Sequence, residues 1–128
     1  MNYYFSTTLT MDFDKAIEAT TAALKEEGFG VLTEIDIAQT MKKKLDVDLP
    51  KYKILGACNP QYAYKALQAE NKIGTMLPCN VIVQDAGGGK VEVSAVNPLA
   101  SMQAVENPEF GALAQEVTDK LKRMISSL

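Results

Sequence analysis

Tyr52-Lys53-Ile54-Leu55-Gly56-Ala57-Cys58-Asn59-Pro60 is the most informative segment for the fold, and its counterpart is Leu77-Pro78-Cys79-Asn80-Val81-Ile82-Val83-Gln84. Each contains a compact apolar run of strand length, over residues 52–57 and 79–84. Asn59-Pro60 is typical of a helix start, because asparagine is favoured at the N-cap and proline at the first helical position. We expect that helix to run to about Glu70, before the breakers Gly74 and Pro78.

The relative direction of these two strands decides which ends of them meet. The helix between them would permit a parallel crossover, but the whole connection is short and is interrupted twice. We therefore favour antiparallel pairing, and the parallel alternative stays open. Antiparallel strands would bring Cys58 and Cys79 to one end of the sheet, whereas parallel strands would place them at opposite ends.

Strand and helix patterns continue toward the N-terminus. Residues 3–9 alternate in type and predict a strand. Asp12 can cap a following helix, whose apolar residues recur at helical spacing until Gly28 offers a stop. Residues 30–35 resume a strand pattern, and residues 37–45 carry an apolar side chain at every fourth position, as in a short amphipathic helix.

The C-terminal part supplies a hairpin and the longest helix. Asp85-Ala86-Gly87-Gly88-Gly89 predicts a turn whose glycines adopt positive φ, and residues 90–96 alternate as the returning strand. Asn107-Pro108-Glu109 starts a helix whose wide apolar stripe continues to Leu128. The order of elements predicts an α+β fold over residues 1–128, with two long helices on one face of a mainly antiparallel sheet.

Size and charge narrow the function classes. The chain has 128 residues, 47% of them hydrophobic and 23% charged, which suits one globular domain. Its formal net charge of −3 gives no electrostatic reason to bind nucleic acid, and the lysines at 42–44 are too few for a phosphate track. No apolar run could span a bilayer and the N-terminus lacks a signal-peptide pattern, so we expect no membrane partner and a cytoplasmic location.

Several kinds of chemistry are excluded by composition. The sequence contains no histidine, which removes His-based triads and His-containing zinc sites. Gly87-Gly88-Gly89-Lys90 lacks the glycine spacing, the following Ser or Thr and the helix of a phosphate loop. Two cysteines cannot complete a four-cysteine zinc site. The sequence assigns no catalytic residue, cofactor or resident metal, and whether the protein is an enzyme stays open.

One candidate site remains, around the two cysteines. Cys58 precedes the proposed N-cap, where the unpaired amides and the dipole of the helix favour a thiolate over a thiol. The strand that ends at Asn97-Pro98 would finish nearby. Free cysteines are also among the most buried residue types, so simple packing is the competing interpretation of each. The candidate ligand-binding residues are Cys58, Asn59, Pro60, Pro78, Cys79 and Asn80.

In these motifs the sequence resembles the domain of unknown function 302 family. The resemblance covers nearly the whole chain and is carried by residues 44–50, 52–60, 73–74 with 77–81, and 91–94. It implies a compact fold similar to TATA-binding-protein-like domains, with helices packed on a curved antiparallel sheet, and it suggests homodimers. It supplies no established activity, substrate or catalytic residue, and a likeness of fold to a DNA-binding protein is no evidence of DNA binding.

We therefore expect an uncharacterised small-ligand-binding or interaction domain, homodimeric, with its site near the two cysteine motifs. The alternative is a thiol redox pair or a soft-metal site for Cu(I)-like ions formed by Cys58 and Cys79, because thiolates are preferred ligands of soft metals. A purely structural protein that dimerises through a sheet edge or an apolar helix face is the third possibility.

Overall fold

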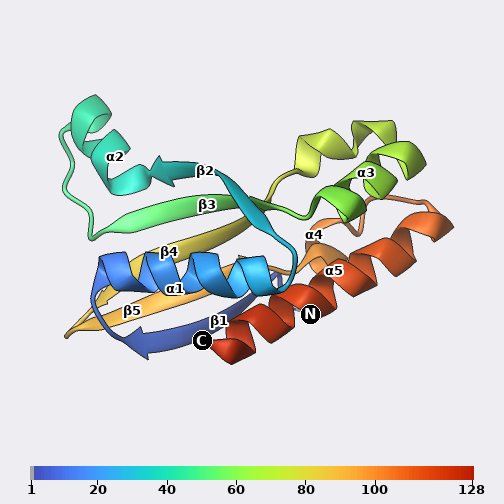
Figure 1. Cartoon of the computed structure of the whole chain (residues 1–128). Coiled ribbons are helices and arrows are strands. Elements are labelled where there is room, and N and C mark those ends of the chain that lie inside the picture. The colour runs from blue at the N-terminus through green and yellow to red at the C-terminus, as the bar shows by residue number, and fades with distance from the viewer. Residues whose placement is uncertain (1) are drawn as a thin grey trace.

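The computed structural model describes residues 2–128, in which five strands and several helices precede a long final helix (Figure 1). The elements are β1 (Tyr4–Thr10), α1 (Phe13–Glu26), β2 (Gly30–Asp36), α2 (Ile37–Leu45), β3 (Tyr52–Cys58), α3 (Pro60–Ala69), the 3₁₀ helix η1 (Asn71–Met76), β4 (Cys79–Gly87), β5 (Lys90–Val96), α4 (Pro98–Ser101) and α5 (Pro108–Ser127). Among these residues, no helix combines the length and the hydrophobicity needed to cross a bilayer.

The five strands form one sheet in the order β1-β5-β4-β3-β2, and every neighbouring pair is antiparallel. The antiparallel pairing of β3 with β4 confirms the favoured prediction and excludes the parallel alternative. In its register Ala57 lies opposite Cys79. The end of β3 and the start of β4 therefore meet at one end of the sheet.

Helices α1 and α5 cover one face of the sheet and also contact each other (Figure 1). Strand alternation turns every second side chain toward that face, where it meets the apolar stripes of the two helices. We call the resulting cluster the main core. Its buried members are Leu9, Phe13, Ala16, Leu24, Phe29, Leu55, Ala57, Cys79, Val81, Val83, Val91, Val93, Ala95, Leu121, Met124 and Ile125.

A second apolar cluster, the end cluster, lies beyond the end of the sheet where β3 stops and β4 starts (Figure 1). Its buried members are Ala66, Ile73, Met102, Phe110 and Ala114, from α3, η1, the segment after α4, and the first half of α5. Helix α5 therefore serves both clusters: its C-terminal half packs in the main core and its N-terminal half in the end cluster.

The predicted α+β class, with two long helices on one face of an antiparallel sheet, is confirmed. Helices η1 and α4 were not predicted, because they are too short to show a helical repeat of apolar residues. A shift in the register of β2 with β3, between Val31 and Thr33, was also not predicted. Strand β4 continues to Gly87, so the hairpin turn is tighter than predicted, but Gly87, Gly88 and Gly89 do have positive φ (80°, 63° and 75°).

Candidate functional site

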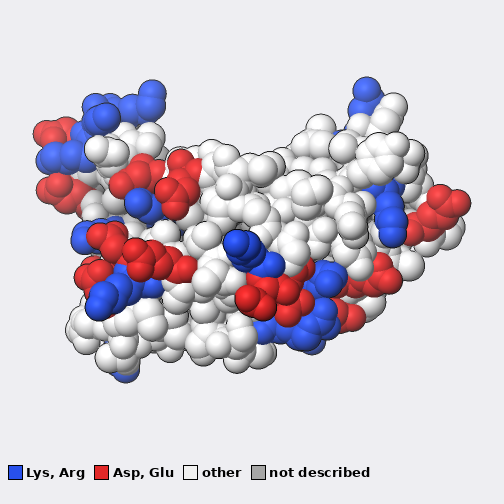
Figure 2. Space-filling model, in the orientation of Figure 1, with Lys and Arg blue, Asp and Glu red and all other residues white. Residues whose placement is uncertain are grey.

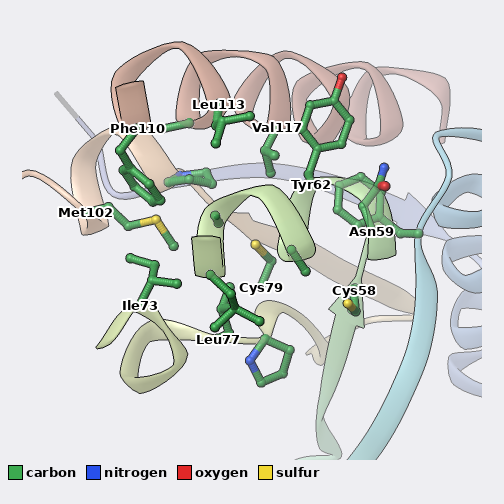
Figure 3. Close-up of a pocket in the computed structure, with 18 of the residues that line it drawn as sticks. Cys58, Asn59, Tyr62, Ile73, Leu77, Cys79, Met102, Phe110, Leu113 and Val117 are labelled. Atoms are coloured by element: carbon green, nitrogen blue, oxygen red, sulfur yellow. The ribbon is translucent and has the colours of Figure 1, made fainter. Parts of the chain in front are cut away.

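An apolar pocket of about 320 Å³ lies between the end cluster and the end of the sheet (Figure 3). The deeper part is lined by side chains from η1, the start of β4, the segment after α4, and α5. They are Ile73, Leu77, Cys79, Met102, Phe110 and Leu113. Toward the end of β3 the lining continues with Cys58, Asn59 and Tyr62. A cavity of this size falls at the lower end of the range seen for small-molecule sites.

Small side chains on two facing helices leave this space open. Ala63 and Ala66, three residues apart, lie on one face of α3, and Ala114 lies on the part of α5 that packs against α3. Protein interiors are ordinarily packed with few voids larger than a water molecule. The pocket exists because these alanines stand where larger residues would close the gap between α3 and α5.

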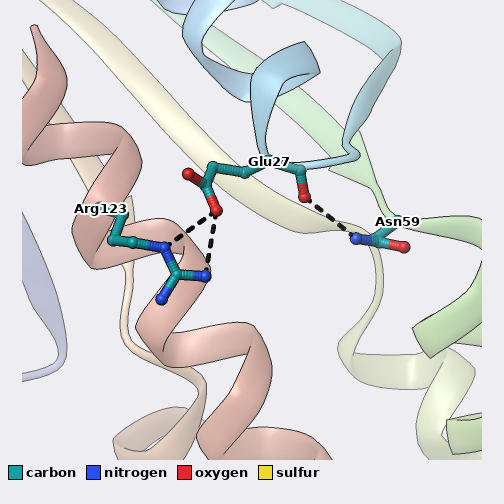
Figure 4. A network of polar contacts seen from close by, with 3 residues as sticks. All are labelled: Glu27, Asn59 and Arg123. Atoms are coloured by element: carbon teal, nitrogen blue, oxygen red, sulfur yellow. Dashed lines mark hydrogen bonds and ion pairs between the residues drawn. The ribbon is translucent and has the colours of Figure 1, made fainter.

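Asn59 fixes the position of α3 by a contact that the sequence did not predict. It occupies the N-cap position, but its side chain makes no hydrogen bond to the first turn of α3. Instead its Nδ2 donates to the main-chain oxygen of Glu27, at 3.3 Å (Figure 4). That oxygen belongs to the C-terminus of α1, where carbonyls lack partners within the helix. The predicted capping bond of Asn59 is therefore replaced by a tether between α1 and α3.

The same Glu27 also ties α1 to α5. Its Oε1 accepts a hydrogen bond from Nε of Arg123 at 3.2 Å and forms an ion pair with Nη2 of the same arginine at 3.1 Å (Figure 4). Gly28, with φ of 87°, allows the chain to turn beside Asn59, and a Cβ at this glycine would lie 2.9 Å from the Asn59 Nδ2. The junction of α1, α3 and α5 is thus held by polar contacts at the border of the pocket.

The two cysteines both line the pocket, yet they belong to opposite faces of the sheet. Cys79 lies opposite Ala57, on the helix-covered face, and Cys58 is one residue further along β3. Successive side chains of a strand point to opposite faces, so the two Cβ atoms point apart. Both thiols are free.

The electrostatic environment of Cys79 favours the neutral thiol. Cys79 is buried, whereas Cys58 is half-buried. Burial, with a smaller contribution from Cys58, raises the pKa of the Cys79 thiol to about 11. Since the thiolate is the reactive and metal-binding form, Cys79 is a poor nucleophile and a poor metal ligand near neutral pH.

The remaining predicted residues divide between the pocket and other surfaces. Pro78 lines the pocket together with Cys58, Asn59 and Cys79. Pro60 is the first residue of α3 and does not line it, although it lies beside Asn59. Asn80 is exposed and borders a separate shallow hollow on the uncovered face of the sheet, because it follows Cys79 and alternation turns it away.

Several lining residues were missed by the sequence analysis. Ile73, Met102 and Phe110 come from segments remote in sequence, and no local pattern shows that they share a cavity. Tyr62 was missed as well, although its place three residues after Asn59 put it in the first turn of α3. A helical projection of α3 could have grouped Tyr62 with Ala63, Ala66 and the predicted N-cap.

The surface next to the pocket is apolar, like its lining. The lining contains no Asp, Glu, Lys or Arg among the described residues. Burial and the nearby carboxylate of Glu116 raise the pKa of the Tyr62 phenol, so it is neutral at physiological pH. Figure 2 shows an uncharged surface between α2 and α3, while charged side chains gather on α2. Leu32 and Leu67, which line the pocket, are exposed by 70% and 42% and contribute to this apolar surface.

The described residues offer no site for a metal of the common hard or borderline type. Within residues 2–128 there is no group of three or more His, Cys, Asp or Glu side chains that could hold an ion. Cys58 and Cys79 together supply two sulfurs, with the geometry and ionisation described above.

Comparisons with known proteins agree on the family and the fold. A family model described as the domain of unknown function DUF302 matches residues 5–128. Comparison with curated proteins gives no match. Among solved structures, the crystal structure of an uncharacterized conserved protein DUF302 from Bacillus stearothermophilus matches with a TM-score of 0.88 and 24% sequence identity, over 97% of this chain and 96% of that one. At this identity the likeness shows the shared fold.

Proposed function

The chain belongs to the family of the domain of unknown function DUF302, and we propose that it binds a small, largely apolar molecule in the pocket between α3, α5 and the end of the sheet. One observation carries the proposal: a cavity of about 320 Å³ whose lining has no charged side chain among the described residues. A well-formed apolar pocket with a few polar groups at its border is the usual form of a small-molecule site.

The volume and the lining define the part of the ligand that would enter. Taking about 30 Å³ for a water-sized group, the pocket holds an apolar body of about ten non-hydrogen atoms. Sugars and nucleotides are unsuitable, because burying their hydroxyl and phosphate groups without partners costs several kcal/mol, on the order of 2–7 for one neutral polar group. Hydrophobic burial would supply the main part of the affinity.

The arrangement supports binding rather than acid-base catalysis. A proton-transfer reaction needs a titratable side chain whose pKa lies near the working pH. The pocket supplies instead the Tyr62 phenol and the Cys79 thiol, whose pKa values are both raised, and the amide of Asn59, which is already bonded to Glu27. A carrier, sensor or scavenger of apolar molecules fits these groups.

A thiol redox or Cu(I)-like metal site at Cys58 and Cys79 is the weaker candidate. The opposed directions of the two side chains and the raised pKa of Cys79 both count against it. Free thiols in this geometry are consistent with a reducing compartment, and the cytoplasm remains our proposed location.

A matched pair of alanine substitutions on α5 tests the binding function. Ala114→Leu adds three methyl-sized groups inside the pocket, whereas Ala112→Leu adds them on the exposed face of the same helix. With 1-octanol as the probe, isothermal titration calorimetry should show saturable binding to the wild type and to Ala112→Leu. Binding to Ala114→Leu should weaken by about tenfold or more, which corresponds to about 1.4 kcal/mol.

Circular dichroism and thermal unfolding show whether each variant is folded, so that a loss of binding can be distinguished from a loss of structure. If Ala114→Leu is folded and still binds octanol as the wild type does, the probe lies elsewhere and the pocket is not the site. Absence of saturable binding of octanol to the wild type would contradict the proposal directly. If Ala114→Leu does not fold, the test uses Ala63→Leu, which fills the pocket from α3.

We also propose that the protein forms a homodimer. Two observations support it: no residue of α2 is buried within the chain, and the neighbouring residues Leu45, Val47 and Leu49 are exposed by 66%, 44% and 44%. Strand β2, which leads into α2, is an edge strand with unpaired backbone groups. Light scattering over a range of concentrations tests the proposal, and a monomer throughout would reject it.

A further inference from the structure

We propose a second binding site on the uncovered face of the sheet, which takes a small organic cation: an ammonium group carried on an aromatic or apolar body. The site is the hollow of about 460 Å³ that Asn80 borders. Its lining combines tyrosines with amide and carboxylate side chains, among them Tyr3, Tyr4, Tyr52, Asn80, Gln84 and Glu92. The proposal is independent of the function proposed above, because the hollow and the apolar pocket share no lining residue.

The hollow is a trough whose floor contains a short side chain. Ser94 on β5 lies directly opposite Ile82 on β4, and both residues line the hollow. Ser94 is only 6% exposed although alternation places it on the uncovered face, so the side chains around it rise above it. One wall is a row of directly paired residues, Glu92, Gln84 and Tyr52, on β5, β4 and β3. This row stands about 7 Å from the floor, because it is two residues away along the strands.

The opposite wall is aromatic and comes from the start of the chain. Tyr4 pairs with Val96, two residues beyond Ser94, and therefore stands on the other side of the floor. Its ring meets the ring of Tyr3 edge to face, with the centroids 4.9 Å apart and an angle of 68° between the ring planes. Tyr3 is nevertheless 70% exposed and Tyr4 40% exposed. Two rings that are ordered by each other and remain open to solvent offer aromatic surface to a ligand.

Glu92 is the one charged side chain among the described residues that line the trough. Its Oε2 accepts a hydrogen bond from the Oγ of Ser6 at 3.0 Å, and the Oγ atoms of Ser6 and Ser94 are 2.9 Å apart, which orients the carboxylate beside the floor. Within residues 2–128 Glu92 forms no ion pair. Lys90, two residues earlier on β5, is exposed and lies outside the lining. The trough therefore holds a negative charge that no side chain of its lining neutralises.

A carboxylate between tyrosine rings favours a cation over a neutral molecule or an anion. Hydrogen bonds between an ammonium group and a carboxylate are charge-assisted, and the negative face of an aromatic ring also attracts a cation. The tyrosines can cover an apolar body, while the amides of Asn80 and Gln84 can donate to or accept from polar groups on it. Nucleic acid and other phosphates are disfavoured, because the lining supplies no positive charge.

Three probes of similar size and different charge test the proposal: 2-phenylethylammonium, 2-phenylethanol and 3-phenylpropanoate. In a titration followed by ¹H–¹⁵N correlation spectra at low salt, the ammonium probe should shift amides of β1, β4 and β5 around the trough and reach saturation. It should bind about fivefold tighter than the alcohol, and the carboxylate probe should bind weakest. The advantage should shrink as salt is added, because the site is open to solvent. Binding in the apolar pocket would instead shift amides of α3 and α5.

Matched variants locate the charge and the aromatic wall. Glu92→Gln should remove the advantage of the ammonium probe over the alcohol, because glutamine can still accept the bond from Ser6 but carries no charge. The control Glu34→Gln removes the same charge from an exposed position on β2 and should keep the advantage. Tyr4→Leu should weaken binding of the ammonium probe by about threefold. Its control Tyr64→Leu, which removes an exposed tyrosine from α3, should leave that binding unchanged.

Several results would overturn the proposal. They are the absence of saturable shifts at the trough, the absence of a preference for the ammonium probe, and a preference that survives in Glu92→Gln. Loss of the preference in Glu34→Gln as well would attribute it to overall charge and reject the role of Glu92. Shifts of the same amides with protein concentration alone would show that a second copy covers this face, which also rejects a small cation there. None of these results bears on octanol binding in the apolar pocket, which Ala114→Leu tests separately.

Discussion

The two clusters that share helix α5 are built from different side chains. In the main core, large residues from α1, α5 and the sheet, Leu24, Leu55, Leu121 and Met124 among them, are completely buried. In the end cluster the facing helices α3 and α5 contribute alanines, and a cavity of about 320 Å³ remains. Both regions are apolar, but only the main core is filled by side chains.

This difference implies a division of roles along a single helix. Completely buried large side chains supply the hydrophobic free energy of folding, and each is costly to truncate because a cavity is left. Around a pocket that is already open, truncation removes little packing and changes mainly the volume open to a ligand. Substitutions at the two ends should therefore separate stability from binding.

The largest expected effect comes from Leu121→Ala in the main core. Leu121 is 0% exposed, so the change should lower the free energy of unfolding by about 2–5 kcal/mol. Leu113→Ala, eight residues earlier on α5, removes a half-buried side chain from the pocket wall and should cost about 1 kcal/mol. Urea unfolding followed by circular dichroism measures both. Equal losses at the two positions would contradict the division between the clusters.

The next effect concerns Cys79, which belongs to the main core and also lines the pocket. Its pKa is about 11 in the folded protein, raised from an ordinary value of 9.0. The folded state therefore holds its proton while the unfolded chain releases it. Stability from this group is complete below pH 9 and is lost as the pH rises toward 11, by about 2–3 kcal/mol.

The Cys79→Ala variant isolates that contribution from the other groups that titrate in alkali. The difference in unfolding free energy between wild type and variant should change across this pH window and stay constant below it. Thiol titration of the native wild type should modify Cys58 well before Cys79 at neutral pH, since Cys58 is half-buried and Cys79 is buried. Rapid modification of both thiols at pH 7 would revive the redox and soft-metal alternative.

The last prediction compares two glycines. A Cβ on Gly56 would lie 2.7 Å from Thr33 Cγ2 and 2.8 Å from Pro78 Cγ, so Gly56→Ala should lower stability by about 1–3 kcal/mol. Gly111, exposed on α5 near the pocket, has nothing within 4 Å of a built Cβ, and Gly111→Ala should raise stability by about 0.5–1 kcal/mol. Thermal unfolding of the two variants gives the comparison, and a stabilised Gly56→Ala would show that β2 and Pro78 shift easily.

The three Asn-Pro pairs show which features local sequence predicts and which features depend on the tertiary structure. In each, asparagine occupies the N-cap and proline the first helical position, as predicted for two of them. Asn97 and Asn107 also accept the expected hydrogen bonds from first-turn amides. The side chain of Asn59 instead bonds to Glu27, 32 residues earlier. Identical dipeptides therefore give the same helix start and different contacts, because the contact depends on what the fold brings near.

The candidate site was predicted in part for the same reason. Cys58, Asn59, Pro78 and Cys79 lie along the pocket, since antiparallel pairing brings their chain ends together, as the short connection indicated. Asn80 lies on the other face, and Ile73, Met102 and Phe110 had no local pattern to identify them. The residues that the sequence could suggest are those adjacent to a predicted strand end.

The type and order of the main strands and helices follow from local sequence, because alternation, helical spacing, capping residues and glycine turns act over a few neighbouring positions. The sequence also removed histidine chemistry from consideration. Long-range packing alone brings the alanines of α3 and α5 to one cavity, places both cysteines in the lining of that cavity, and brings Lys65 and Lys120 to the Tyr62 ring. These features depend on strand register and helix docking, which join residues far apart in the chain.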